Sequence, residues 1–222
     1  MKRTIAALAL LALAATSFAA SKEVEDLLSS MRKAYKDLGT ATFTMQSTLV
    51  GDNGDLSIKM VGGFKSPNQM YIDITSDDNS VSVVTDGKTI YAVRSGSTNV
   101  REARFSNDTM GNVLAGANLE LINFYDWKRQ LSTADGDNMH DSKLAIRKNE
   151  KWNDRTWWVL EETAPTVGVY VEYYIDPKTY LVWRTVQMTL DKEFTRGDFI
   201  IKSLKTGVKI DDKKFKKPII TY

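Results

Sequence analysis

The chain has 222 residues, with 30 basic and 28 acidic side chains, one histidine and no cysteine. This length is enough to bury a sizeable core in one domain. The lack of cysteine excludes a disulfide-stapled scaffold, thiol catalysis and thiolate metal sites. The near balance of charge argues against nucleic acid as the main partner, because proteins that bind nucleic acid normally carry a basic excess.

Residues 1–19 have the pattern of a secretory signal peptide. Lys2 and Arg3 precede an apolar run from Ile5 to Ala15, and a small-x-small cleavage site ends at Ala19. The run is shorter than the ~20 apolar residues of a membrane-spanning helix. Removing 19 of the 222 residues leaves 203, with 28 basic and 28 acidic side chains. We expect residues 20–222 to form a single exported domain, located in the periplasm, or secreted if the host has a single membrane.

The first element predicted after the signal peptide is a helix from Ser21 to Leu38. Apolar residues recur at helical spacing from Val24 onward, and acidic residues gather in the first turn. Gly39 follows the expected end, where glycine commonly stops a helix.

After this helix the apolar period changes to two, which is typical of strands. We expect the first strands around residues 42–49, 56–64, 70–75, 81–85 and 89–94. Residues 107–127 break the pattern and are interpreted as one or two short helices with a loop. Strands resume at residues 143–148, 156–163, 169–176, 180–190 and 199–204. The order predicts an α+β, mainly β fold, in which helices pack on one face of a large antiparallel sheet.

The sequence presents no candidate for catalysis or metal binding. His140, the single histidine, lies in a polar loop without the serine-and-base arrangement of a triad. A calcium loop that started at Asp135 would need glycine and glutamate where His140 and Ile146 stand. Glu161 and Glu162 are neighbours on one strand, so they point to opposite faces and cannot share a proton. We therefore predict no enzyme activity, no metal and no cofactor.

The remaining functional signal is apolar surface on the strands. Methionines fall on three successive strands, on faces that also carry Phe43, Phe64 or Ile72. Methionine is flexible and polarizable, so it suits a surface that repacks around varied apolar guests. The alternative is an ordinary sheet–helix core, which composition alone favours. Trp157 and Trp158 are adjacent on one strand and must serve opposite faces.

The order of motifs along the chain resembles that of the LolA/LolB-like lipoprotein carrier superfamily. The similar segments are FKSPNQMYIDI at 64–74, the hairpin from Val84 to Tyr91, IDPKTYLVWR at 175–184 and VKIDDKKFKKP at 208–218. They occur in order across nearly all of residues 20–222. The resemblance implies a curled, unclosed antiparallel barrel or half-barrel, with helices as a lid over an apolar cavity.

The same resemblance implies a non-enzymatic, monomeric carrier of lipoprotein acyl chains or a similar lipid. Its candidate partners are an inner-membrane release complex and an outer-membrane acceptor. One departure bears on release, because Ser66 stands where the carrier has an arginine that is held to couple lid closure to release of cargo. The expected cavity lining is Phe43, Met45, Met60, Phe64, Met70, Ile72, Tyr174 and Trp183, with Leu114, Leu119 and Leu121 from the lid.

Two other hypotheses remain open. A sensor or adaptor of envelope stress would bind lipid or a misassembled envelope protein, and then a membrane partner. A structural envelope protein would have a filled core and no saturable site. A hydrolase comes last, because histidine and cysteine chemistry is missing.

Overall fold

The computed structural model describes residues 21–51, 54–66, 68–77, 79–106, 143–164, 168–189 and 196–218. The predicted signal peptide, the predicted helical insert at 107–127 and His140 lie outside these ranges. Within them, no helix has both the length and the apolar character to cross a membrane.

Helix α2 (Lys22–Lys36) begins at a capped N-terminus, since the Val24 N–H donates to the side-chain oxygen of Ser21 at 3.4 Å. It ends two residues earlier than predicted, with Asp37 as its C-cap. The N–H of Leu38 turns back to the carbonyl of Tyr35, and this tighter turn brings the Leu38 side chain into the core. The face of α2 that packs on the sheet carries Val24, Leu27, Leu28, Met31 and Tyr35.

Eleven strands are described, and the predicted ones are all among them. They are β1 (Thr40–Gly51), β2 (Gly54–Lys65), β3 (Gln69–Ser76), β4 (Ser80–Asp86), β5 (Thr89–Arg94), β6 (Arg101–Arg104), β7 (Lys143–Trp152), β8 (Arg155–Ala164), β9 (Val169–Ile175), β10 (Val182–Thr189) and β11 (Arg196–Thr206). The short strand β6 was not predicted, because its four residues, three of them charged, lack an apolar alternation.

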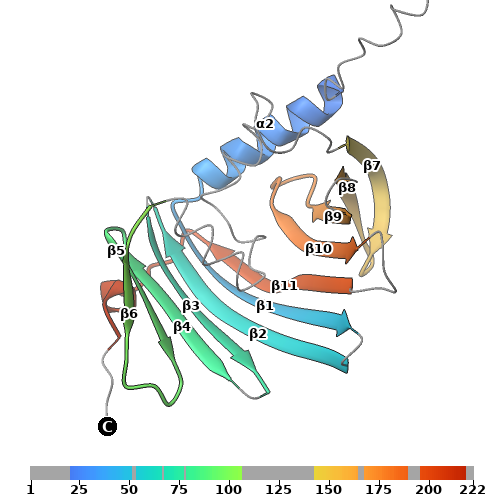
Figure 1. Ribbon diagram of the computed structural model, residues 1–222. Coiled ribbons are helices and arrows are strands. Elements are labelled where there is room, and N and C mark those ends of the chain that lie inside the picture. The colour runs from blue at the N-terminus through green and yellow to red at the C-terminus, as the bar shows by residue number, and fades with distance from the viewer. Residues whose placement is uncertain are drawn as a thin grey trace, which may run out of the picture.

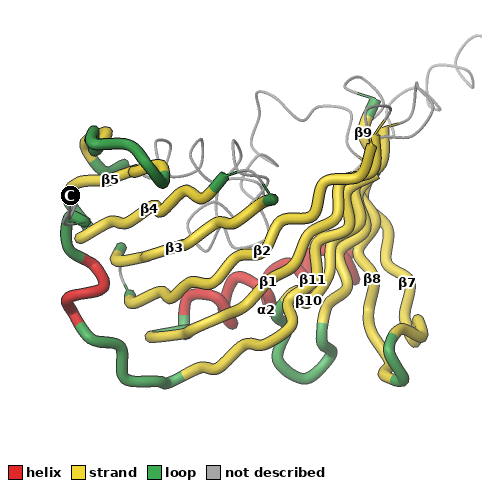
Figure 2. Tube along the Cα trace, turned by 90° about the horizontal axis from the view of Figure 1, so that it is seen from below, coloured by secondary structure: helices red, strands yellow, loops and turns green. Residues whose placement is uncertain are grey.

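The strands form one antiparallel sheet in the order β6-β5-β4-β3-β2-β1-β11-β10-β9-β8-β7. Two meanders, β1–β6 and β7–β11, are joined where β1 pairs with β11. The sheet curls around α2 without closing, and α2 lies on one side of it (Figures 1 and 2). The predicted mainly β fold with a curled, unclosed antiparallel sheet is therefore confirmed.

We call the face toward α2 the inner face and the opposite one the outer face. The inner face holds the main core, in which Met31 of α2 meets Met45, Met60 and Met70 of three adjacent strands, all fully buried. This pattern follows from the alternation of strand residues, which places every second side chain on the same face.

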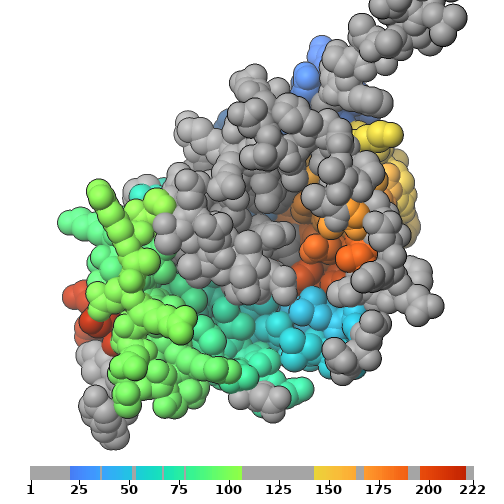
Figure 3. Space-filling view, in the orientation of Figure 1, coloured from blue at the N-terminus to red at the C-terminus, as the bar shows by residue number. Residues whose placement is uncertain are grey.

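The outer face is partly covered by a C-terminal strap, which we define as residues 211–218. Its short helix η4 (Asp212–Phe215) places the buried ring of Phe215 at 5.9 Å from the ring of Tyr71 on β3. Lys65 bonds Asp212 at 2.5 Å, and Lys217 pairs with Glu102 of β6. The strap, which is the last described segment of the chain, thus packs against the β3–β6 end of the sheet, shown in green in Figure 3.

Candidate functional site

The inner apolar face brings together six of the residues predicted to line a cavity. Met45 pairs with Met60, and Phe64 pairs with Met70, so their side chains lie next to each other across the strands. The six have exposed fractions between 0% and 4%: Phe43, Met45, Met60, Phe64, Met70 and Ile72. The face is therefore continuous over β1, β2 and β3.

Gly62 allows the ring of Phe43 to lie flat on this face. The two residues are paired between β1 and β2, and a Cβ at Gly62 would come within 2.4 Å of the Phe43 ring and 2.7 Å of the Tyr71 carbonyl oxygen. A residue with a side chain at this position would force the ring or the backbone to move.

Tyr174 lies on the outer face, which differs from its predicted place in the lining. Tyr173 and Ile175 point inward with the core, so strand alternation turns Tyr174 outward. Its ring stacks 5.0 Å from the guanidinium carbon of Arg184 and 5.8 Å from the ring of Trp152.

Trp183 is the extra residue of a bulge in the β9–β10 pairing. Val182 pairs with Ile175 and Arg184 pairs with Tyr174, so Trp183 has no partner residue on β9. It packs against the inner core, while its ring also lies 6.3 Å from Trp157. A bulge of this kind cannot be recognised from apolar spacing. This explains why the sequence analysis placed both Tyr174 and Trp183 in the cavity lining.

The two adjacent tryptophans serve opposite faces, as predicted. Trp158 lies inward against Tyr180, with ring centres 5.9 Å apart. Trp157 lies outward, is 2% exposed and packs against Trp152 at 5.3 Å.

Ser66 is exposed in the turn after β2, and its N–H donates to the carbonyl of Gly39 at 2.8 Å. It lines a pocket of about 550 Å³ at the C-terminal end of α2. The other lining residues are Ala34, Asp37, Leu38, Gly39, Thr40, Lys65, Thr206 and Gly207. The predicted lid residues Leu114, Leu119 and Leu121 lie outside the described residues.

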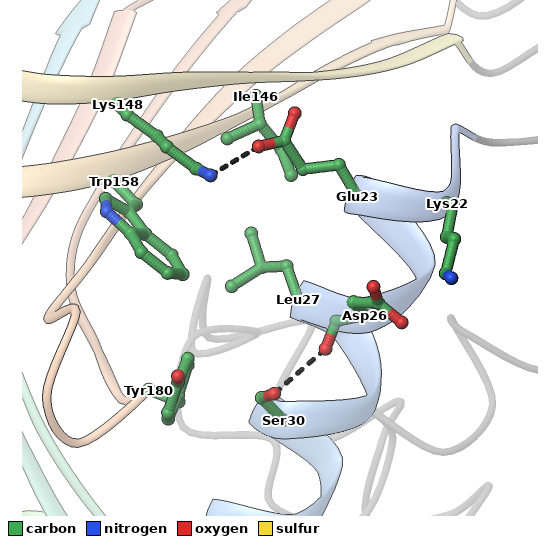
Figure 4. A pocket seen from close by; sticks show the side chains of 9 residues that line it. All are labelled: Lys22, Glu23, Asp26, Leu27, Ser30, Ile146, Lys148, Trp158 and Tyr180. Carbon is green, nitrogen blue, oxygen red and sulfur yellow. Dashed lines mark hydrogen bonds and ion pairs between the residues drawn. The ribbon is translucent and has the colours of Figure 1, made fainter.

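A second pocket, of about 460 Å³, lies at the N-terminal end of α2 (Figure 4). Leu27 points from the helix toward Trp158 and Tyr180, and these three form apolar walls together with Ile146. The polar rim is made of Lys22, Glu23, Asp26, Ser30 and Lys148. This volume is within the range of small-molecule sites, which are mostly apolar with a few polar groups.

The charges at this rim form an exposed ion pair. Lys148 pairs with Glu23, and its Nζ lies 5.0 Å from the centre of the Trp158 ring. Both partners are well exposed, and such pairs contribute little in water. The pocket can therefore hold an apolar group beneath a polar rim. Among the described residues, no group of three acidic, histidine or cysteine side chains could bind a metal.

Tyr35 and Tyr180 were not identified from the sequence. Burial raises the pKa of Tyr35, whose hydroxyl accepts a bond from the backbone N–H of Val182. Tyr180 has a positive φ of 57° in the β9–β10 turn, and this unusual backbone directs its ring toward the pocket. Pro177 favours a bend in this segment, but a proline does not set the direction of the ring three residues later.

At the level of sequence, the chain matches no protein-family model and no curated protein. Many solved structures match the fold of this chain, and two of them are described first. MucB matches with a TM-score of 0.55 and 18% identity, over 90% of this chain and 64% of that chain. An uncharacterized conserved protein from Thermus thermophilus matches with a TM-score of 0.55 and 10% identity, over 89% of this chain and 95% of that chain. This chain spans less than two thirds of the length of MucB.

A LolA superfamily protein from Nitrosomonas europaea matches with a TM-score of 0.43 and 10% identity, over 87% of this chain and 97% of that chain. At sequence identities this low, such matches give information about the fold alone. The architecture predicted from the order of motifs is confirmed by the sheet itself, which is curled, unclosed and antiparallel with α2 against its inner face.

Proposed function

We propose that this protein is a non-enzymatic carrier of the cell envelope that holds an acyl chain or a similar lipid against the inner face of its sheet. The observation that carries the proposal is the continuous apolar inner face, in which methionines of α2, β1, β2 and β3 meet. Flexible methionine side chains can separate and repack around an inserted chain at little cost in shape.

The energetics of such binding need no polar chemistry. Each CH₂ group removed from water contributes about 0.8 kcal/mol, so an acyl chain gains affinity in proportion to the length that is buried. In this proposal an acyl chain enters beneath the helix from one of the two pockets at the ends of α2. Movement of α2 away from the sheet is the step that this proposal requires.

Three expectations from the sequence belong to this proposal. Residues 1–19 direct export to the periplasm, and cargo passes between an inner-membrane complex and an outer-membrane acceptor. The exposed Ser66 bonds Gly39 in the link between α2 and β1, where a side chain could couple movement of α2 to release of cargo.

The test is titration with a fluorescent fatty-acid probe, together with native mass spectrometry of gently purified protein. We expect saturable binding of one probe per chain and a co-purifying mass of lipid size. Two matched variants on β2 locate the site. Leu56 and Val61 are each 41% exposed but lie on the inner and outer faces respectively. Leu56→Ser should weaken probe binding, and Val61→Ser should leave it unchanged.

Absence of both lipid and probe binding would overturn the carrier and favour a structural protein with a filled core. An adaptor that binds a protein is the second candidate. It is supported by the fold shared with MucB, which has been solved in complex with MucA. Recovery of one membrane protein, without lipid, in a pull-down with the full chain would favour the adaptor.

A further inference from the structure

Three buried polar atoms have no hydrogen-bond partner in the part of the chain that the structure describes. They are the hydroxyl oxygens of Ser47 and Thr185 and the indole nitrogen of Trp183. Ser47 has no exposed surface, and Thr185 is 5% exposed. Such groups are uncommon in folded proteins, because burial removes their bonds to water without replacing them.

The two hydroxyls lie in one row across the inner face. Ser47 of β1 pairs with Phe199 of β11, and Phe199 pairs with Thr185 of β10. The row continues to Tyr173 of β9, which packs against the inner core. Because paired residues on adjacent strands share a face, both hydroxyls point to the side on which α2 lies.

Phe199 stands between them in the row, but its ring is displaced along the strand. A Cβ at Gly197 would lie 2.7 Å from the ring, so the ring covers the space that the side chain of another residue would fill. Gly197 therefore lets the ring lie flat toward Leu49 and leaves the hydroxyls on either side of it.

The surroundings decide which polar group could bind there. Met45 and Leu49 flank Ser47 on the same face of β1, and Ile58 is paired with it on β2. A charged head group would be buried among these side chains without a counter-charge, which is strongly unfavourable. A neutral carbonyl needs only donors, and a hydroxyl can donate. A plain hydrocarbon would leave both hydroxyls without a partner.

We propose that Ser47 and Thr185 donate hydrogen bonds to the carbonyl oxygens of an acyl ester or amide whose chain lies on the inner face. This inference rests on the proposed carrier function and deepens it. It assigns the cargo to neutral acylated molecules, in preference to free fatty acids or hydrocarbons.

The test compares three ligands with the same chain length for their ability to displace a fluorescent acyl probe from delipidated protein. They are monopalmitoylglycerol, which has an ester carbonyl, N-palmitoylethanolamine, which has an amide carbonyl, and 1-O-hexadecylglycerol, which has neither. We expect the ester, the amide or both to bind about five-fold more tightly than the ether, as one or two neutral hydrogen bonds would give. The stronger of the two identifies the linkage.

Ser47→Ala and Thr185→Val should each remove much of this preference while leaving the affinity for the ether unchanged. Both variants should also raise the urea midpoint of the delipidated protein, because they remove a buried group without a partner. Ser57→Ala, on the exposed outer face of β2, is the matched control and should change neither property.

The outcomes separate this inference from the function on which it rests. If none of the three ligands displaces the probe, the carrier proposal fails. If all three displace it equally, or if the two variants keep the full preference, the carrier stands and the assignment of Ser47 and Thr185 is overturned.

Discussion

The hydroxyl of Tyr35 accepts a hydrogen bond from the backbone N–H of Val182 at 3.0 Å. The bond joins the last turn of α2 to the first residue of β10, and it lies inside the core, where Tyr35 is 6% exposed and Val182 has no exposed surface. Apolar contacts alone would let the helix slide on the inner face, whereas a directional bond fixes its position. Any movement of α2 that admits a ligand must either move Val182 together with the helix or break this bond.

Tyr35→Phe should therefore lower the free energy of unfolding by about 1–3 kcal/mol, because the buried N–H of Val182 loses its acceptor. Urea unfolding followed by tryptophan fluorescence measures the change. Tyr91→Phe, on the outer face of β5, is the control and should stay within about 0.5 kcal/mol of the wild type. Equal stability of Tyr35→Phe and the wild type would mean that the bond does not anchor the helix.

Tyrosine ionisation should destabilise the protein at high pH. Burial raises the pKa of Tyr35, and burial followed by hydrogen bonds to Glu161 and Glu172 raises that of Tyr170. Because both folded pKa values are higher than the unfolded value near 10, the stability they contribute is complete below that pH and decreases above it.

The urea midpoint should thus fall as pH rises above about 10, and fall less steeply in Tyr35→Phe and in Tyr170→Phe. A series of urea titrations at fixed ionic strength measures this dependence. If the urea midpoint falls with pH as steeply in both variants as in the wild type, other groups control the loss of stability at alkaline pH.

Arg147 on the outer face prevents repulsion between two carboxylates. Glu161 and Glu172 are directly opposite on β8 and β9, and Arg147 bonds one at 2.7 Å and the other at 2.5 Å. Arg147→Met should cost about 1–2 kcal/mol, a value reduced by partial exposure of the three groups.

Adding Glu172→Gln to the Arg147→Met variant should recover part of the loss at pH 7. If the double variant is less stable than Arg147→Met alone, the packing of the arginine matters more than the charge that it neutralises.

Phe215 should control the docking of the C-terminal strap. Phe215→Ala removes a ring that is 1% exposed and packs on Tyr71, which costs about 3 kcal/mol of docking free energy. The strap should then detach locally, and limited trypsin digestion should cut it at its lysines before the sheet unfolds. Lys213→Ala keeps the ring and should leave the remaining sites protected.

The sequence predicted the sheet well because period-two apolar patterns and turn residues mark antiparallel strands. It also predicted that Glu161 and Glu162 point to opposite faces, which is confirmed. Glu161 bonds Arg147 on the outer face, and Glu162 accepts a hydrogen bond from Tyr173 at 3.0 Å on the inner face. Local rules were sufficient for these features.

Features that depend on distant parts of the chain were not predictable in this way. The bulge at Trp183 interrupts the alternation of β10, so the relation between Trp183 and Tyr174 across the two strands does not follow from apolar spacing. The bond between Tyr35 and Val182 and the strap on Tyr71 join residues that no local period connects. Neither could be found without the three-dimensional arrangement of the strands.

The pairing of β1 with β11 means that the middle of the sheet is assembled from strands near opposite ends of the sequence. During synthesis β2 to β6 can add to β1 one hairpin at a time, but the other edge of β1 waits for the last strand. An open strand edge is a template for wrong association, and contacts between distant residues form slowly. The interval before β11 returns is therefore when this chain is most exposed to misassembly, and most in need of a chaperone.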